Sequence, residues 1–88
     1  MGYSVSLSSK ARSMLKKLDK HQASIIASWI ESNLQGCEEP RAIGKALTGD
    51  LRDYWRYRIG SYRLIAKICD KELIIEVINV GHRRDIYQ

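Results

Sequence analysis

The chain has 88 residues, and its 15 lysines and arginines against 10 acidic residues give a net charge of +5 at neutral pH. This length allows one domain, residues 1–88, with a single modest core, and it excludes a second core. The basic excess favours a polyanionic partner such as RNA, DNA or an acidic protein.

The sequence carries no recognisable targeting or metal signal. No apolar run approaches the ~20 residues that a membrane helix needs, and the N-terminus lacks the basic start and apolar centre of a signal peptide. We therefore expect a cytoplasmic protein that makes no membrane contact. Cys37 and Cys69 form neither a CxxC nor a Cys/His metal pattern, so we expect reduced thiols and neither a metal nor another cofactor.

Apolar periodicity predicts one strand and then two helices in the first half of the chain. Residues 3–7 alternate as a strand does. Ser8 or Ser9 can cap a first helix, whose apolar residues at helical spacing are Ala11, Met14, Leu15 and Leu18. After a break at Asp19 and Lys20, a second helix ends at Gly36 and carries Ile25, Ile26, Trp29, Ile30 and Leu34. Two short neighbouring helices predict a helical hairpin.

The second half of the chain predicts a loop and then an antiparallel meander. Residues 37–50 contain the one proline and two glycines, which indicates a loop. The three predicted strands are Arg52–Ile59, Tyr62–Cys69 and Leu73–Val80. Gly60-Ser61 suits a type II′ turn, and Asp70-Lys71 is read as a second two-residue turn. The fold class is α+β, in which an N-terminal strand and a two-helix hairpin precede a three-stranded meander and the helices pack on one sheet.

Two-residue turns fix the register of both hairpins, and facing residues sum to 121 in the first. Because side chains alternate along a strand, one face is then apolar and suited to the helices. It holds Trp55, Tyr57, Ile59, Tyr62, Leu64, Ala66, Ile68, Leu73, Ile75 and Val77. The opposite face is basic and holds Arg56, Arg58, Arg63, Ile65, Lys67, Ile74, Glu76 and Ile78.

This register places Arg58 directly opposite Arg63, and Glu76 opposite Ile65, diagonal to Arg63 and Lys67. Like charges that face each other across a strand pair reduce stability, whereas a bound polyanion reverses the sign of the effect. Arginine also offers a planar fork of donors that fits phosphate oxygens. The basic face therefore predicts an anion site, although a solvated face relieved by Glu76 would explain the same residues.

The C-terminal tail, residues 81–88, follows the last predicted strand beside this face. Histidine exchanges protons near neutral pH, so His82 is a candidate acid or base. Tyr87 can donate a proton or stack on a base, and Arg83 can stabilise charge on a phosphate in the transition state. These groups are sufficient in kind to cut RNA without a metal, through attack of the 2′-oxygen on the adjacent phosphate.

The sequence resembles the RelE/ParE toxin superfamily, and within it RelE, over essentially its whole length. The resemblance is carried by Lys45-Ala-Leu-Thr-Gly49, by residues 54–64 (YWRYRIGSYRL) and by residues 80–87 (VGHRRDIY). It implies a toxin that enters the ribosomal A site and cleaves mRNA there. It also implies a RelB-like antitoxin that blocks the toxin, and a toxin–antitoxin complex that binds operator DNA and represses its own operon.

By position, the resemblance assigns catalytic roles to Arg63, Arg83 and Tyr87, and His82 joins them as the candidate base. The predicted substrate-binding residues are Lys45, Arg56, Arg58 and Lys67. The best-studied member has lysines at the positions of Arg56 and Arg58, and arginine cannot act as a general base because it stays protonated. The base is therefore open between His82, Glu76 and a ribosomal group.

Two other functions remain open from the sequence. A ParE-like toxin would inhibit DNA gyrase without chemistry of its own, because members of one fold can differ in function. A plain binding module would act only as a co-repressor with its antitoxin. The arginine-rich face together with His82, Arg83 and Tyr87 favours the nuclease, since a gyrase inhibitor would not need these groups.

Overall fold

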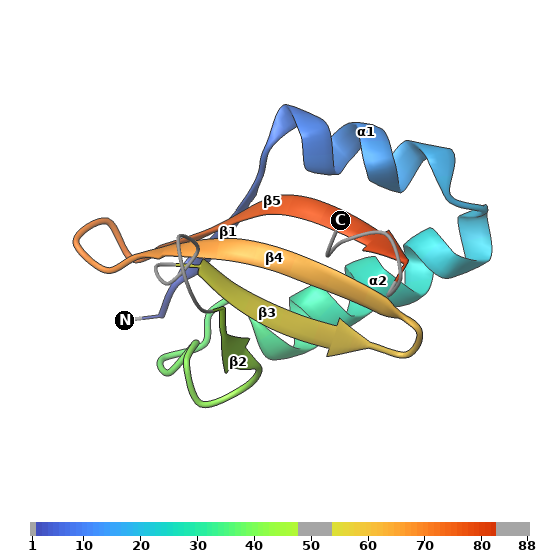
Figure 1. Cartoon of the computed structure of the whole chain (residues 1–88). Coiled ribbons are helices and arrows are strands. Elements are labelled where there is room, and N and C mark those ends of the chain that lie inside the picture. The colour runs from blue at the N-terminus through green and yellow to red at the C-terminus, as the bar shows by residue number, and fades with distance from the viewer. Residues whose placement is uncertain (1, 48–53, 83–88) are drawn as a thin grey trace.

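Two helices and a five-stranded mixed sheet make up the computed structural model, which describes residues 2–47 and 54–82 (Figure 1). The elements in chain order are β1 Ser4–Leu7, α1 Ser9–Lys17, α2 Lys20–Asn33, β2 Lys45–Ala46, β3 Tyr54–Ile59, β4 Tyr62–Cys69 and β5 Ile74–His82. The strands lie in the order β1-β5-β4-β3-β2. The predicted α+β class is confirmed. No helix in the described part of the chain is both long and apolar enough to cross a membrane.

Both helices begin at side-chain caps. The Ser8 hydroxyl accepts a hydrogen bond from the backbone N–H of Ala11 at 3.0 Å. An Asp19 carboxylate oxygen accepts from the backbone N–H groups of His21 and Gln22 at 2.7 and 3.1 Å. Such caps satisfy N–H groups that have no partner within a helix. Of the two predicted caps, Ser8 is the one that caps α1, and the predicted break at Asp19 and Lys20 is confirmed at Asp19, whereas Lys20 already belongs to α2.

One core lies between the helices and one face of the sheet. α1 lies along β5, while α2 runs back behind the sheet (Figure 1). The buried residues are Ala11 from α1, Ile26 and Ile30 from α2, Leu34, and from the sheet Tyr57, Ile59, Leu64, Ala66, Ile75, Val77 and Val80. Six residues of the predicted apolar face lie in this cluster, Trp55 and Tyr62 pack against it and Ile68 is buried, whereas Leu73 lies in the turn before β5.

The sheet differs from the predicted meander at both edges. β1 joins it by pairing in parallel with β5, from Ser4 opposite Ile74 to Leu7 opposite Val77. At the other edge, the predicted loop over residues 37–50 contains the two-residue strand β2, which pairs with β3. Gly44 precedes β2 with φ +79°, and a Cβ built there would lie 2.3 Å from the backbone oxygen of Arg56. Only glycine lets the chain approach β3 this closely.

The first hairpin has the predicted register and the second does not. Gly60 has φ +59°, as the first position of a type II′ turn requires, and residues that face each other in β3 and β4 sum to 121. The second turn has four residues, Asp70 to Leu73, rather than two, so the predicted register of this hairpin is wrong. Leu73 adopts φ 55° there, and its carbonyl accepts a hydrogen bond from Ser4 N–H at 2.8 Å.

A β-bulge changes the pairing along β5 a second time. Cys69 faces Ile74 and Ala66 faces Val77, but beyond the irregularity Ile65 faces Asn79, which leaves Ile78 as the extra residue. Glu76 therefore faces Lys67 instead of the predicted Ile65. Beyond the bulge the two faces of β5 exchange, because side chains alternate along a strand.

Candidate nucleic-acid interface

A pocket of about 430 Å³ lies at the β2–β3 edge of the sheet. Its lining has a cationic part and an uncharged part. The cationic residues are Lys45, Arg56, Arg58 and Arg63, and the uncharged residues are Trp29, Ile43, Gly44 and Tyr57. The structure thus brings four of the predicted site residues together around one space. A concentration of cationic side chains in a concave site attracts anions.

The pocket lining includes the predicted pair of Arg58 and Arg63, which face each other across β3 and β4. Ile59 and Tyr62 close the two-residue hairpin as a hydrogen-bonded pair, so the next pair, Arg58 and Arg63, is non-hydrogen-bonded and its side chains approach most closely. Arg58 is exposed, whereas Arg63 is 7% exposed. Two side chains of like charge therefore start from directly opposite positions on neighbouring strands, and one of them is largely removed from water.

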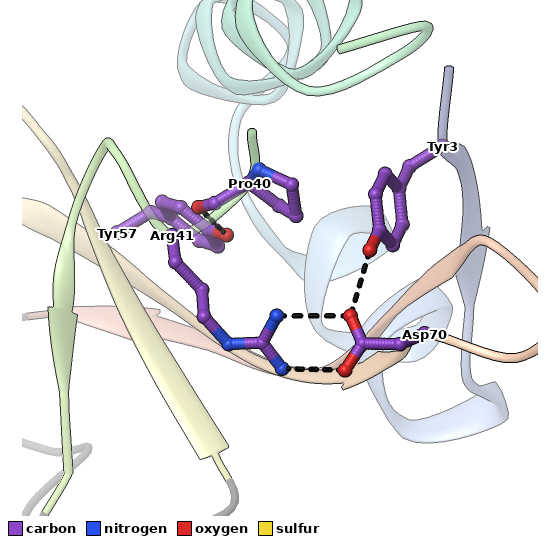
Figure 2. Close-up of polar contacts among 5 residues, drawn as sticks. All are labelled: Tyr3, Pro40, Arg41, Tyr57 and Asp70. Atoms are coloured by element: carbon purple, nitrogen blue, oxygen red, sulfur yellow. Dashed lines mark hydrogen bonds and ion pairs between the residues drawn. The ribbon is translucent and has the colours of Figure 1, made fainter. Parts of the chain in front are cut away.

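The loop before β2 supplies Ile43 and Gly44 to the pocket lining. An ion pair that no local sequence pattern predicts joins this loop to the turn after β4. The guanidinium of Arg41 donates two hydrogen bonds to the carboxylate of Asp70, at 2.9 and 3.0 Å, and the Tyr3 hydroxyl donates a third at 2.7 Å (Figure 2). The Arg41 hydrogen bonds, with help from Tyr3, lower the pKa of Asp70 to about 2. The same contact with Asp70 raises the pKa of the Tyr3 phenol.

Two aromatic side chains of β3 also donate hydrogen bonds to the backbone of this loop. The Tyr57 hydroxyl donates to the backbone oxygen of Pro40 at 2.7 Å (Figure 2), and the Trp55 indole N–H donates to that of Ile43 at 2.7 Å. The Arg41 guanidinium also lies 6.0 Å from the centre of the Trp55 ring. Burial raises the pKa of the Tyr57 phenol, so this donor stays protonated. These contacts join residues distant in sequence, and no local pattern signals them.

Lys67 lies outside the pocket lining. It is exposed on β4 and faces Glu76 on β5. It stands four residues along the strand from Arg63, a separation of about 13 Å at the usual rise of a strand. The structure thus separates Lys67 from the cationic group that it was predicted to join.

His82 is also separated from the arginine pair. Beyond the bulge Gly81 faces Arg63, and His82 faces Tyr62 on the helix side of the sheet. The His82 and Tyr62 rings meet edge to face, with centroids 5.5 Å apart and an interplanar angle of 74°. The predicted residues Arg83 and Tyr87 lie outside the described residues. Within residues 2–47 and 54–82, no group of three or more His, Cys, Asp or Glu side chains is placed to hold a metal ion.

Comparison with known proteins gives consistent matches. Residues 5–87 match the family model described as the ParE toxin of the type II toxin–antitoxin system parDE. The chain is 32% identical to Toxin RelG of Mycobacterium tuberculosis, over 100% of its own length and 99% of that protein.

Two solved structures show the same fold. The toxin–antitoxin complex RelBE2 from M. tuberculosis contains a chain that is 29% identical, with a TM-score of 0.85 over 94% of this chain and 100% of that one. A mutant of the Escherichia coli toxin RelE in the free state is 20% identical, with a TM-score of 0.74 over 99% and 90% of the respective chains.

Proposed function

Because the chain belongs to the ParE toxin family of type II toxin–antitoxin systems, within the RelE/ParE superfamily, we propose that it is an mRNA endonuclease of the RelE type. In this proposal the toxin acts in the cytoplasm, enters the ribosomal A site and cuts mRNA there, which stops translation. The observation that carries the proposal is the cross-strand pair of Arg58 and Arg63 in a pocket shared with Lys45 and Arg56. An RNA phosphate there would turn an unfavourable pair of charges into a binding site.

The proposed reaction needs no metal. The 2′-oxygen of one ribose attacks the adjacent phosphorus, the bond to the 5′-oxygen breaks, and a 2′,3′-cyclic phosphate forms. Negative charge grows on the phosphate oxygens as this happens. Arg63, largely removed from water, and Arg58 would hold those oxygens, where each charged donor is worth more than it is in bulk solvent. Arg83 and Tyr87 are proposed as a further charge donor and as the acid or stacking group.

His82 is the proposed base for the proton of the 2′-oxygen. Its exposed ring follows directly on Gly81, the residue that faces Arg63, and so stands at the end of the sheet beside the arginine pair. It lies on the helix side, so it can act only if the RNA bends round the end of β5. A group of the ribosome is the alternative, since the ribosome would also hold the mRNA in a reactive geometry.

A RelB-like antitoxin is the proposed protein partner, as in the M. tuberculosis RelBE2 complex. A segment with acidic and apolar residues would neutralise the cationic pocket, because complementary charge speeds and directs binding. The toxin–antitoxin complex, and not the free toxin, would bind operator DNA and repress the operon.

Primer extension on a message translated by purified ribosomes tests the proposal. We expect cuts in A-site codons with wild-type protein, about 10²-fold fewer with Arg63→Ala, and no change with Arg12→Ala, which removes an exposed arginine from α1. Equal cutting of naked and translated message would contradict ribosome dependence. The family match to ParE makes gyrase inhibition the second candidate. Inhibition of gyrase supercoiling by wild-type protein, without any RNA cleavage, would favour it.

A further inference from the structure

The uncharged side of the pocket contains an aromatic ring that the proposed reaction does not use. Trp29 of α2 lines the pocket and is half-buried, whereas the neighbouring Tyr57 is fully buried. The two rings pack at 5.8 Å with an interplanar angle of 51°, so Tyr57 supports the indole from within the core. Trp29 is therefore the aromatic side chain of this pocket that remains accessible, and its position is fixed by a buried neighbour.

Residues 40–45 form the rim of the pocket, so that Trp29 and the cationic side chains line the same cavity. The Trp55 indole and the Tyr57 hydroxyl hold the backbone of Ile43 and Pro40 against β3. The next residue, Gly44, passes too close to β3 for any side chain. Lys45 then follows at the rim, where it faces Arg56 across the β2–β3 pair. Hydrogen bonds from the core side thus hold the backbone of the rim in place, which preorganises the pocket before a ligand binds.

We propose that this pocket holds one unstacked nucleotide of single-stranded RNA, with its phosphate on Lys45, Arg58 and Arg63 and its base against the Trp29 indole. The volume of about 430 Å³ lies within the usual range of small-ligand sites. A phosphate alone would use only the cations, and an apolar ligand would use only the aromatic side. A nucleotide uses both, because every base has a face that stacks on an aromatic ring. The inference rests on the proposed function and makes Trp29 a substrate-binding residue.

The test compares two probes that differ only in the base, adenosine 5′-monophosphate and ribose 5-phosphate. Binding to the purified toxin is followed by calorimetry and by the NMR signals of the two indole N–H groups. We expect the nucleotide to bind at least ~5-fold more tightly, the lower end of the range for one stacked base, and to shift the Trp29 signal most. Trp29→Leu should abolish this preference while ribose 5-phosphate still binds. Trp29→Phe should keep part of it.

Ile25→Ala is the matched control, because Ile25 lies on the same helix, is 43% exposed and does not line the pocket. It should retain the full preference. Equal affinity of wild-type protein for the two probes, or a preference that survives in Trp29→Leu, would overturn the inference. If Trp29→Leu does not fold, the wild-type comparison and Trp29→Phe still decide.

The proposed nuclease activity and the proposed nucleotide site can be rejected independently of each other. Base-dependent binding through Trp29 without ribosome-dependent cleavage would reject the nuclease and keep the nucleotide site. Cleavage by a toxin that does not distinguish the two probes would keep the nuclease and reject the nucleotide site.

Discussion

Neutralising Arg58 should stabilise the fold while it removes activity. Like charges directly opposite each other on two strands cost roughly 0.2–1 kcal/mol. Arg58 and Arg63 form such a pair, and Arg63 is 7% exposed, so solvent screens it poorly. Methionine keeps an unbranched side chain without the charge. We therefore expect Arg58→Met to raise the free energy of unfolding by ~0.2–1 kcal/mol, or the unfolding midpoint by about 1–8 °C for a domain of this size.

Thermal unfolding at low and moderate salt measures this effect. Salt screens the repulsion over a Debye length of ~10 Å at 0.1 M, so the midpoint of the wild type should rise with salt more than that of Arg58→Met. Lys17→Met at the end of α1 removes an exposed charge that has no lysine or arginine three or four residues before it on the helix, and it provides the control. Cleavage of translated mRNA by Arg58→Met should fall by about 10²-fold.

Two results would refute the reasoning. A lower midpoint for Arg58→Met would mean that the pair does not repel in the folded protein. An equal salt response in wild type and variant would mean that the charge of Arg58 makes no net contribution to stability.

Three further predictions concern the other polar groups. Asp70 has a pKa of about 2 against an ordinary value of 3.8, so its contribution to stability is present above pH ~4 and is lost as the pH falls towards 2; in urea titrations between pH 2 and 5, Asp70→Asn should lose this pH dependence, and an unchanged slope would reject the ion pair. Tyr57→Phe leaves the Pro40 carbonyl without its donor and should cost about 1–3 kcal/mol in urea unfolding, whereas Tyr62→Phe, on the half-buried tyrosine of β4, should cost little. His82→Gln should slow single-turnover cleavage by at least ~10-fold with little change in RNA binding, and full activity would reject His82 as the base.

Local signals predicted the parts of the fold that depend on neighbours in sequence. Ser8 and Asp19 begin helices because each has a side-chain acceptor directly before an amphipathic run. Gly60 determines the first hairpin, and the Arg58–Arg63 pair follows from it by counting. The cationic half of the site could therefore be predicted from the sequence alone.

The second hairpin could not be predicted, because its length depends on distant residues. Asp70 and Lys71 resemble a two-residue turn, but the carboxylate of Asp70 is held by Tyr3 and Arg41, and the carbonyl of Leu73 is held by Ser4. These partners precede the turn by 29 residues or more along the chain. The same absence of local signal explains why the loop contacts that form the pocket rim were missed.

The bulge in β5 determines which residue of β5 faces Arg63, and Ser8 forms hydrogen bonds with the backbone at this bulge. The backbone N–H of Ser8 donates to the carbonyl of Val77 at 2.9 Å, and its hydroxyl donates to that of Ile78, the extra residue, at 3.2 Å. The residue that begins α1 therefore supplies donors to two carbonyls at the bulge. Because of this bulge Gly81, and not Val80, faces Arg63, and the one side chain directly opposite Arg63 is that of Arg58. The strand irregularity thus places glycine backbone, and no second side chain, opposite Arg63, while His82 falls on the helix side of the sheet beside Tyr62.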